Sequence, residues 1–228
     1  MIYFSIDIET TGLNPQTDDV LQIGLVAENS EIPTEIEHLP TLNLVLARKR
    51  VAGHPSAMKM NAELLGVVGD DKLHKRLARV DAIVAAYDEP SPKEVVDVKD
   101  VIGVPGILTT CRGRPAYFIA PKNAFYAVRE WLTSIAGAGP YTPAGKNFAG
   151  FDLQFLIALD DRFRALFRHR TLDAGSLLVD WSDQCPASLD LLKQRHLGGG
   201  TVAHDAIDDA IDVIRLLRTT YPKAGGAS

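Results

Sequence analysis

The sequence is poor in cysteine, in long apolar runs and in surplus positive charge. Its two cysteines, Cys111 and Cys185, lie far apart and have no metal-ligand spacing, so we expect free thiols in a reducing compartment, the cytoplasm. No apolar run approaches the roughly 18–20 residues of a membrane span. The N-terminus enters an apolar strand pattern without a charged leader, and we therefore expect neither a signal peptide nor a membrane anchor.

The charge balance argues against one class of partner. A formal net charge of −5 does not favour broad, nonspecific binding to duplex nucleic acid. It does not exclude a nucleic-acid enzyme, because clustered catalytic acids lower the net charge and bound metal ions offset them locally. The 228 residues suffice for one sizeable domain and hardly for two. We expect a single domain over residues 1–228, with a frayed tail at about 223–228.

The hydrophobic pattern predicts three strands in quick succession, followed by helices mixed with short strands. This order indicates an α/β domain with a mixed sheet that begins as an antiparallel meander. The expected strands are 2–9, 20–28, 41–46, 141–147 and 170–173, and the expected helices are 55–68, 73–87, 121–135, 152–159, 188–195 and about 203–219. Residues 88–117 contain several prolines and are expected to form an irregular insertion, with a hairpin at 107–110 and 117–119.

Two carboxylates, Asp7 and Glu9, stand two residues apart in the first apolar strand. Side chains alternate across a strand, so both acids point to the same face. Two acids on one face of a buried strand repel each other and are unfavourable to desolvate, and a divalent cation between them relieves both effects. The sequence thus predicts a metal site here. Tyr3 and Ser5 share the face of the acids, while Phe4, Ile6 and Ile8 occupy the other.

The second acidic feature is Asp152, which lies between a glycine-containing turn and an apolar helix. Aspartate is a favoured helix-capping residue, and this role alone explains its position. A functional role is the alternative, and the motif taken by itself does not decide between them.

The third acidic feature is the start of the last helix. At about 100° per residue the apolar positions form one buried stripe, and Asp205, Asp208 and Asp212 are expected to be solvated and matched to the helix dipole. Asp209 lies at the edge of the stripe and is the acid expected to face the sheet. His204 precedes the helix and is a surface residue, a cap or a group that approaches a bound water. The apolar stripe comprises Ala203, Ala206, Ile207, Ala210, Ile211, Ile214 and Leu217.

Together and in this order, the motifs resemble the DEDDh family of 3′–5′ exonucleases, which includes polymerase proofreading exonucleases and oligoribonucleases. The resemblance spans residues 4 to about 218, and only the insertion at 88–117 has no counterpart. It implies a ribonuclease H-like three-layer fold with a central mixed sheet of five strands flanked by helices. The matching stretches are Asp7-Ile-Glu9-Thr-Thr-Gly12-Leu13, Asn147 through Asp152 to Leu156, and His204 with Asp209 five residues later.

The resemblance implies a metal-dependent exonuclease that releases nucleoside 5′-monophosphates from the 3′ ends of single-stranded DNA or RNA. Two Mg²⁺ or Mn²⁺ ions roughly 3.5–4 Å apart would act on the scissile phosphate. It assigns Asp7 as the ligand of both ions, Glu9 and Asp209 to the first and Asp152 to the second. His204 is the implied general base, and it places the chain in the histidine subclass, because the sister group has tyrosine there.

Substrate contacts are also implied by the resemblance. Backbone N–H groups after the metal strand would reach the terminal nucleotide, and Leu13 would wedge against the terminal base. The alternatives are a simple tight turn at Gly12 and a core position for Leu13. For Met58 and Met60 we expect packing in the core rather than a place beside the second base. The residues assigned to substrate are Thr10, Thr11, Gly12, Leu13, Met60, Asn61 and Asn147.

The expected partner is single-stranded nucleic acid with a free 3′ end and no membrane. Three basic runs, 48–50, 72–79 and 162–170, are candidates to guide the strand, and at most one is expected to do so rather than form a solvated face. A homodimer or a polymerase partner is compatible with the sequence, as is a docking or lid role for the insertion. The main alternative is a noncatalytic nucleic-acid-binding or polymerase-associated module that kept the exonuclease fold.

Overall fold

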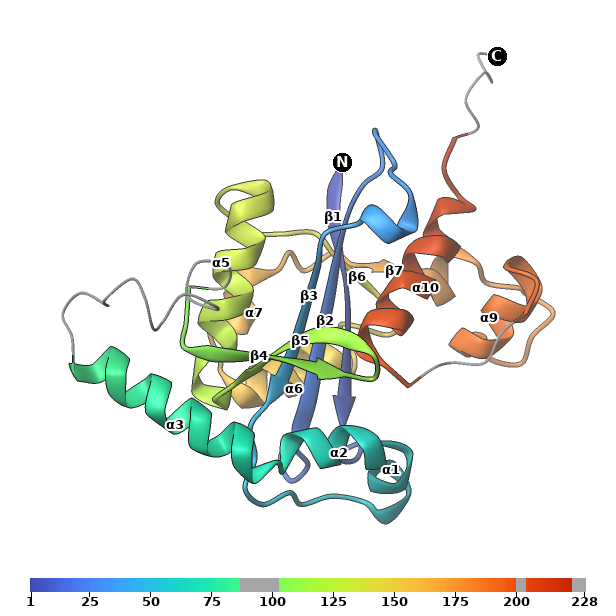
Figure 1. Ribbon diagram of the computed structural model, residues 1–228. Helices are drawn as coiled ribbons and strands as arrows, with labels where there is room; N and C mark the ends of the chain where they lie inside the picture. The colour runs from blue at the N-terminus through green and yellow to red at the C-terminus, as the bar shows by residue number, and fades with distance from the viewer. Residues whose placement is uncertain (87–102, 200–203, 223–228) are drawn as a thin grey trace.

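The computed structural model describes residues 1–86, 103–199 and 204–222 (Figure 1). Within them, seven strands form one mixed sheet in the order β4-β5-β3-β2-β1-β6-β7. The strands are β1 (Ile2–Thr10), β2 (Val20–Asn29), β3 (Thr41–Leu46), β4 (Gly106–Cys111), β5 (Arg114–Ile119), β6 (Pro143–Gly145) and β7 (Leu172–Asp173).

The sheet has two strands more than the five expected. The hairpin predicted inside the insertion forms as β4 and β5, and β5 pairs in parallel with β3, from Leu44 beside Tyr117 to Leu46 beside Ile119. The free edge of β3 offers unpaired backbone groups, and the hairpin satisfies them. Most of the remaining expected insertion falls in residues 87–102, which lie outside the described residues. The start of the last expected helix, at 203, and the tail at 223–228 also lie outside them.

Helices cover the sheet from both sides. They are α1 (Pro55–Met60), α2 (Ala62–Val68), α3 (Asp71–Ala86), α5 (Ala124–Ala136), α6 (Asp152–Leu159), α7 (Phe163–Leu166), α8 (Ala174–Leu177), α9 (Leu189–His196) and α10 (Ala206–Arg218). Short 3₁₀ turns at η1 (Ile36–His38) and η2 (Pro121–Asn123) complete the described elements. None of the helices in this part of the chain has the length and apolar character needed to cross a bilayer.

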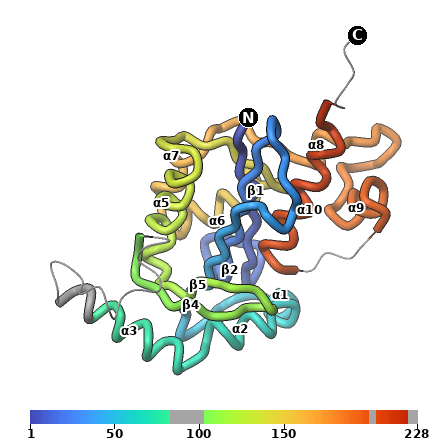
Figure 2. Tube along the Cα trace, turned by 45° about the horizontal axis from the view of Figure 1, so that its top comes forward, coloured from blue at the N-terminus to red at the C-terminus, as the bar shows by residue number. Residues whose placement is uncertain are grey.

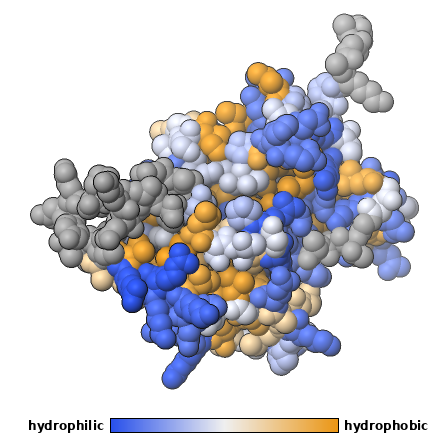
Figure 3. Space-filling view, in the orientation of Figure 1, coloured by the Kyte–Doolittle hydropathy of each residue, from blue (hydrophilic) through white to orange (hydrophobic). Residues whose placement is uncertain are grey.

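The alternation predicted for the first strand separates two apolar cores. Phe4, Ile6 and Ile8 pack with α5, α6 and α7 on one face, and Tyr3 packs with α8, α9 and α10 on the other. The two views show these helix groups on opposite sides of the central strands (Figure 2). A third apolar cluster joins α2 and α3 to the hairpin, and hydrophilic residues cover the outer surface of α3 (Figure 3).

Gly24 lets the last helix approach the sheet beside the first acid. It pairs with Asp7 across β1 and β2, and a Cβ built on it would lie 2.5 Å from the carbonyl carbon of Ala206 and 2.6 Å from its oxygen. The first turn of α10 therefore rests directly on the backbone of β2. Because Gly24 has no side chain, the acidic start of α10 can lie close to Asp7.

Gly24→Ala should destabilise the protein by about 1–3 kcal/mol, because the added methyl group meets backbone that can move only with the whole helix. Gly66→Ala in α2 is the matched control. Nothing lies within 4 Å of its added Cβ, and alanine in a helix is favoured by about 0.5–1 kcal/mol. Urea unfolding of both variants measures the difference. Equal effects of the two substitutions would contradict the close contact between α10 and β2.

Candidate metal centre

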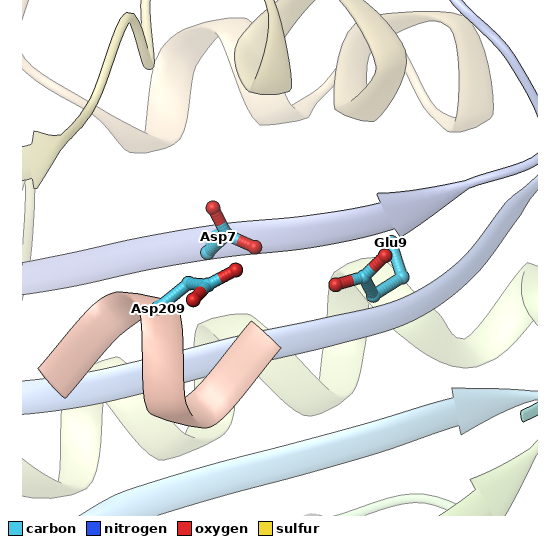
Figure 4. A group of neighbouring side chains, drawn as sticks. All are labelled: Asp7, Glu9 and Asp209. Atoms are coloured by element: carbon cyan, nitrogen blue, oxygen red, sulfur yellow. The ribbon is translucent and has the colours of Figure 1, made fainter. Parts of the chain in front are cut away.

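Three carboxylates from two ends of the chain meet on one face of the sheet. Asp7 and Glu9 come from β1 and Asp209 from the first turns of α10, and one oxygen of each lies within 4.8 Å of the others. Figure 4 shows the three side chains pointing toward one another. The shared face of Asp7 and Glu9 follows from strand alternation, and Asp209 faces the sheet as its place on the helix predicted.

The start of α10 is held by Asp205, whose carboxylate caps the helix. Its Oδ1 accepts hydrogen bonds from the backbone N–H of Ile207 at 3.1 Å and of Asp208 at 3.3 Å, and its Oδ2 accepts one from Gln22 Nε2 at 3.2 Å. The cap fixes the first turn, and with it the direction of Asp209.

The expectation that Asp205 and Asp212 are solvated is wrong. Asp205 is 2% exposed and Asp212 is 5% exposed. Helix α10 packs against the sheet and also against α9, so its water-facing side is narrower than the apolar stripe suggests. Asp212 is compensated by ion pairs with Lys193 and, at 2.9 Å, with Arg215. Asp208 is partly exposed, as expected, and pairs with Arg114.

Asp152 does not cap its helix. Phe151 occupies the cap position of α6, while the buried Asp152 carboxylate accepts a hydrogen bond from the N–H of Ile8 at 3.1 Å. Strand β6 pairs with β1 only at Phe4 and Ser5, and Phe4 donates its N–H to Thr142 O at 3.0 Å. The N–H of Ile8 points to the same edge beyond the end of β6, because donors alternate along a strand. Asp152 supplies the missing acceptor and so stands beside Asp7.

Burial disfavours the ionised form of the carboxyl groups at this site. Desolvation raises the pKa of Asp7 well above its ordinary value, and the charges of Asp152 and Asp209 add to the effect. Desolvation also raises the pKa of Asp152 to about 8 and that of Asp209 to about 7. The pKa of Glu9 rises to about 7 for the same reason, with Arg112 opposing the shift. The group therefore favours bound protons or a bound cation over free negative charge.

One oxygen of the cluster lacks a partner. Asp209 Oδ1 is buried and has no hydrogen-bond partner among the described residues. A buried polar atom is normally satisfied, and an orphaned carboxylate oxygen is especially unfavourable. The donor set contains only oxygen atoms, which suits hard divalent cations such as Mg²⁺ and Mn²⁺. The orphan and the ligand chemistry both fit a cation between the three acids.

His204 lies directly before the capping aspartate. It is exposed and has a left-handed backbone, with φ of 49°. The cap interpretation is wrong for His204, because Asp205 caps the helix. The exposure of His204 agrees with the interpretation of a surface residue. Its action on a bound water stays a prediction.

The residues after the metal strand meet the expectations only in part. Thr10, Thr11 and Gly12 are buried, and the N–H of Thr11 donates to Asp19 O at 2.9 Å. The N–H of Thr11 is therefore occupied in this structure, and the contact of Thr10, Thr11 and Gly12 with a nucleotide stays a prediction. Leu13 is 83% exposed, so its alternative role as a core residue is wrong, whereas the wedge role stays a prediction.

The second group of assigned residues is divided between surface and interior. Met60 is 53% exposed, so core packing is wrong for Met60, and Met58 is half-buried. Asn61 is buried and donates from Nδ2 to Thr10 O at 3.1 Å. Asn147 is exposed with φ of 63°, and its N–H donates to Asp173 Oδ2 at 2.5 Å. Asn61 is thus tied to the metal strand, while Asn147 is tied to β7.

Arg112 is a site residue that the sequence reasoning missed. Its Nη1 lies 4.0 Å from Glu9 Oε1 and 4.0 Å from Asp205 Oδ2, and its Nη2 donates to Asn61 Oδ1 at 3.0 Å. The residue sits at the tip of the β4–β5 hairpin, inside the stretch expected to be irregular. The hairpin pattern was detectable in the sequence, but no local signal states where its tip docks.

The basic runs lie mainly on exposed surface. Arg48 forms a 2.9 Å ion pair with Asp19, and the four basic residues of α3 are exposed. Arg162 pairs with Asp160 and stacks over the ring of Tyr126 at 4.5 Å. These contacts account for Arg48 and Arg162 as structural residues.

Comparison with models of known protein families and with curated proteins finds no match for this chain. The residues and their arrangement are therefore the basis for assigning a function.

Proposed function

We propose that this protein is a metal-dependent 3′–5′ exonuclease that releases nucleoside 5′-monophosphates from single-stranded DNA or RNA, on a ribonuclease H-like fold. The observation that carries the proposal is the meeting of Asp7, Glu9 and Asp209 within 4.8 Å. Asp152, from the second acidic motif, joins them at the same strand through the N–H of Ile8. A mixed sheet with helices on both faces is compatible with the proposed fold.

The four acids have separable roles in the proposal. Asp7, Glu9 and Asp209 would hold one divalent cation, and Asp7 and Asp152 would hold a second. When bound, such ions supply Lewis-acid stabilisation of the phosphate and an acidified water. The protein contributes a rigid, desolvated ligand set, in which the cap at Asp205 orients Asp209 and the edge of β1 orients Asp152.

His204 is the proposed general base that accepts the proton of the attacking water. Imidazole is the side chain most often used as a general base, and the exposed place of His204 before α10 leaves it accessible to a strand end. His204→Ala should slow turnover by about 10²–10⁴-fold, the usual contribution of a general base.

The His204 prediction is measured by single-turnover kinetics beside titration calorimetry of Mn²⁺. Metal affinity should change little, because the carboxylates remain. His38→Ala is the control, since His38 is also exposed but lies in η1. A variant at His204 that turns over at the native rate would remove the residue from the mechanism.

The function itself is tested with two single-stranded oligonucleotides, one DNA and one RNA, each labelled at the 5′ end. Each is incubated with Mg²⁺, with Mn²⁺ and with chelator, beside the Asp7→Ala variant. A ladder that shortens from the 3′ end and depends on metal and on Asp7 is the expected result, and the faster strand gives the substrate class. No cleavage of either strand would favour the noncatalytic binding module instead.

A further inference from the structure

Arg112 reaches the acid cluster from an element that the family resemblance does not cover. Its side chain is 13% exposed, and its Nη1 is buried without a hydrogen-bond partner among the described residues. The 4.0 Å separations from Glu9 and Asp205 are too long for hydrogen bonds. The guanidinium therefore holds unused N–H donors beside Glu9.

The backbone beneath this side chain is unusual. Arg112 and Gly113 form the two-residue turn between β4 and β5, with φ values of 48° and 75°. Such turns favour asparagine, aspartate or glycine at the first position, because a Cβ is disfavoured at positive φ. An arginine at the first position of this turn is therefore conformationally unfavourable. Strained backbone of this kind is typical of positions where the side chain has a separate role.

The guanidinium is also held in place before any ligand arrives. Its Nη2 donates to Asn61 Oδ1, and Asn61 is itself anchored to the backbone of Thr10. A donor fixed in this way loses little conformational freedom when it binds an acceptor. The planar fork of an arginine matches the paired oxygens of a phosphate group.

The negative charge of the acid cluster favours a fixed positive charge beside it. Glu9 and Asp205 face Arg112. Both interact electrostatically with Asp7, which also interacts with the carboxylates of Asp152 and Asp209. An anionic strand that approaches these acids is repelled unless fixed positive charge meets it. Cations held by the acids would supply part of that charge, and would also release Arg112 from its attraction to Glu9.

We propose that Arg112 binds a backbone phosphate of the nucleic-acid strand whose end enters the acid cluster. This inference rests on the proposed function, because it takes the strand as the ligand. The hairpin β4–β5 is then a substrate-binding arm, with Arg112 as its contact to the strand.

The test combines a protein substitution with removal of charge from one phosphate. Binding is measured by fluorescence anisotropy in Mn²⁺, with Asp152→Asn as the background to prevent cleavage. The asparagine can still accept the hydrogen bond from Ile8. The probes are single-stranded oligonucleotides of one sequence, each with an uncharged methylphosphonate at one of the linkages nearest the 3′ end. Each probe is measured with Arg112 intact and with Arg112→Gln.

Arg112→Gln should weaken binding of the fully charged strand by about 10- to 100-fold, the effect of losing a charge-assisted hydrogen bond. A methylphosphonate at one linkage should weaken binding of the Arg112 protein by a similar factor. At that linkage alone the two changes should not add, because both remove the same contact. Arg114→Gln is the matched control. It removes an equal charge from the same hairpin, but Arg114 is more exposed and pairs with Asp208, so its effect should be small and additive at every linkage.

Additive effects of Arg112→Gln at every linkage would overturn the proposal, as would the same small loss for both arginines or no binding by the Arg112 protein. If thermal melting shows that Arg112→Gln is unfolded, Arg112→Lys replaces it. Lysine keeps the positive charge but lacks the planar fork of the guanidinium. Arg112→Lys should therefore weaken binding less than Arg112→Gln, and its effect should be non-additive with the methylphosphonate at the same single linkage. The cleavage assay on the native chain is independent. Position-specific coupling without cleavage would retain the phosphate contact and reject the exonuclease, and cleavage with additive effects would do the reverse.

Discussion

Asp209→Ala should abolish turnover, whereas Asp208→Ala, one residue away, should leave it nearly unchanged. Asp209 is buried and its carboxylate meets those of Asp7 and Glu9. Loss of a metal-ligating acid removes several kcal/mol of transition-state stabilisation, a rate loss of about 10³-fold or more. Asp208 is partly exposed and forms an ion pair with Arg114. An exposed pair of this kind contributes about 0.2–1 kcal/mol to stability.

The measurement is initial rate on the better of the two oligonucleotides, with urea unfolding of both variants to establish that each is folded. Asp7→Ala should behave as Asp209→Ala does. Asp7→Ala and Asp209→Ala should also lose affinity for Mn²⁺ in titration calorimetry. This loss distinguishes removal of a metal ligand from removal of a general base. If Asp208→Ala inactivates the protein and Asp209→Ala does not, the acids of α10 have been assigned to the wrong roles.

Without divalent cations, the protein should become less stable as the pH rises from about 4 to about 8. Ordinary carboxyl pKa values near 4 apply in the unfolded chain, whereas burial raises the pKa of Glu9 and Asp209 to about 7 and that of Asp152 to about 8 in the fold. In this window the folded state binds more protons than the unfolded state, so the free energy of unfolding falls with pH. Glu9 alone accounts for a loss of about 3 kcal/mol across the window.

Three acids outside the cluster act with the opposite sign but in a different pH window. Ion pairs or hydrogen bonds lower the pKa of Asp160, Asp180 and Asp183, so their contribution is present above their unfolded pKa and is lost on acidification. That loss occurs below about pH 4, where unpaired carboxyls protonate. The interval between pH 4 and pH 8 therefore reports on the buried cluster.

Divalent cations should cancel the loss. Mg²⁺ or Mn²⁺ should raise the free energy of unfolding strongly at pH 8 and little at pH 5, where protons occupy the acids and compete with the metal. The experiment is urea unfolding in chelator and in metal at several pH values. Glu9→Gln is the control, because it removes one titrating group while keeping the size of the side chain, and it should flatten the pH dependence. Stability that is constant or that increases over this range would contradict a buried, uncompensated acid cluster.

Local pattern was sufficient for most strands, for the longer helices and for one part of the site, whereas the short helices α7 and α8 were not expected. Strand alternation places Asp7 and Glu9 on a common face, and the apolar stripe of the last helix turns Asp209 toward the sheet. These relations depend on residues close in the sequence, for which the geometry of a strand or helix leaves few alternatives. The α/β class followed for the same reason, from the order of the periodic segments.

Three features of the site were decided only by the tertiary structure. Asp152 faces inward because β6 ends early and leaves the N–H of Ile8 without a strand partner. Asp205 is buried because the start of α10 lies against Gln22 of β2 and Arg112 of the hairpin. Asp212 is buried because α9 covers a side of α10 that its own periodicity marks as polar.

The third feature is Arg112, which reaches Glu9 because the hairpin pairs with the far edge of β3. Its docking joins residues 9, 61, 112 and 205, which no local pattern connects. The sequence by itself thus determined which acids could meet, because their faces are set by local backbone geometry. Which other groups surround them was decided by strand ends, helix packing and an added sheet edge, because these depend on contacts between segments far apart in the chain.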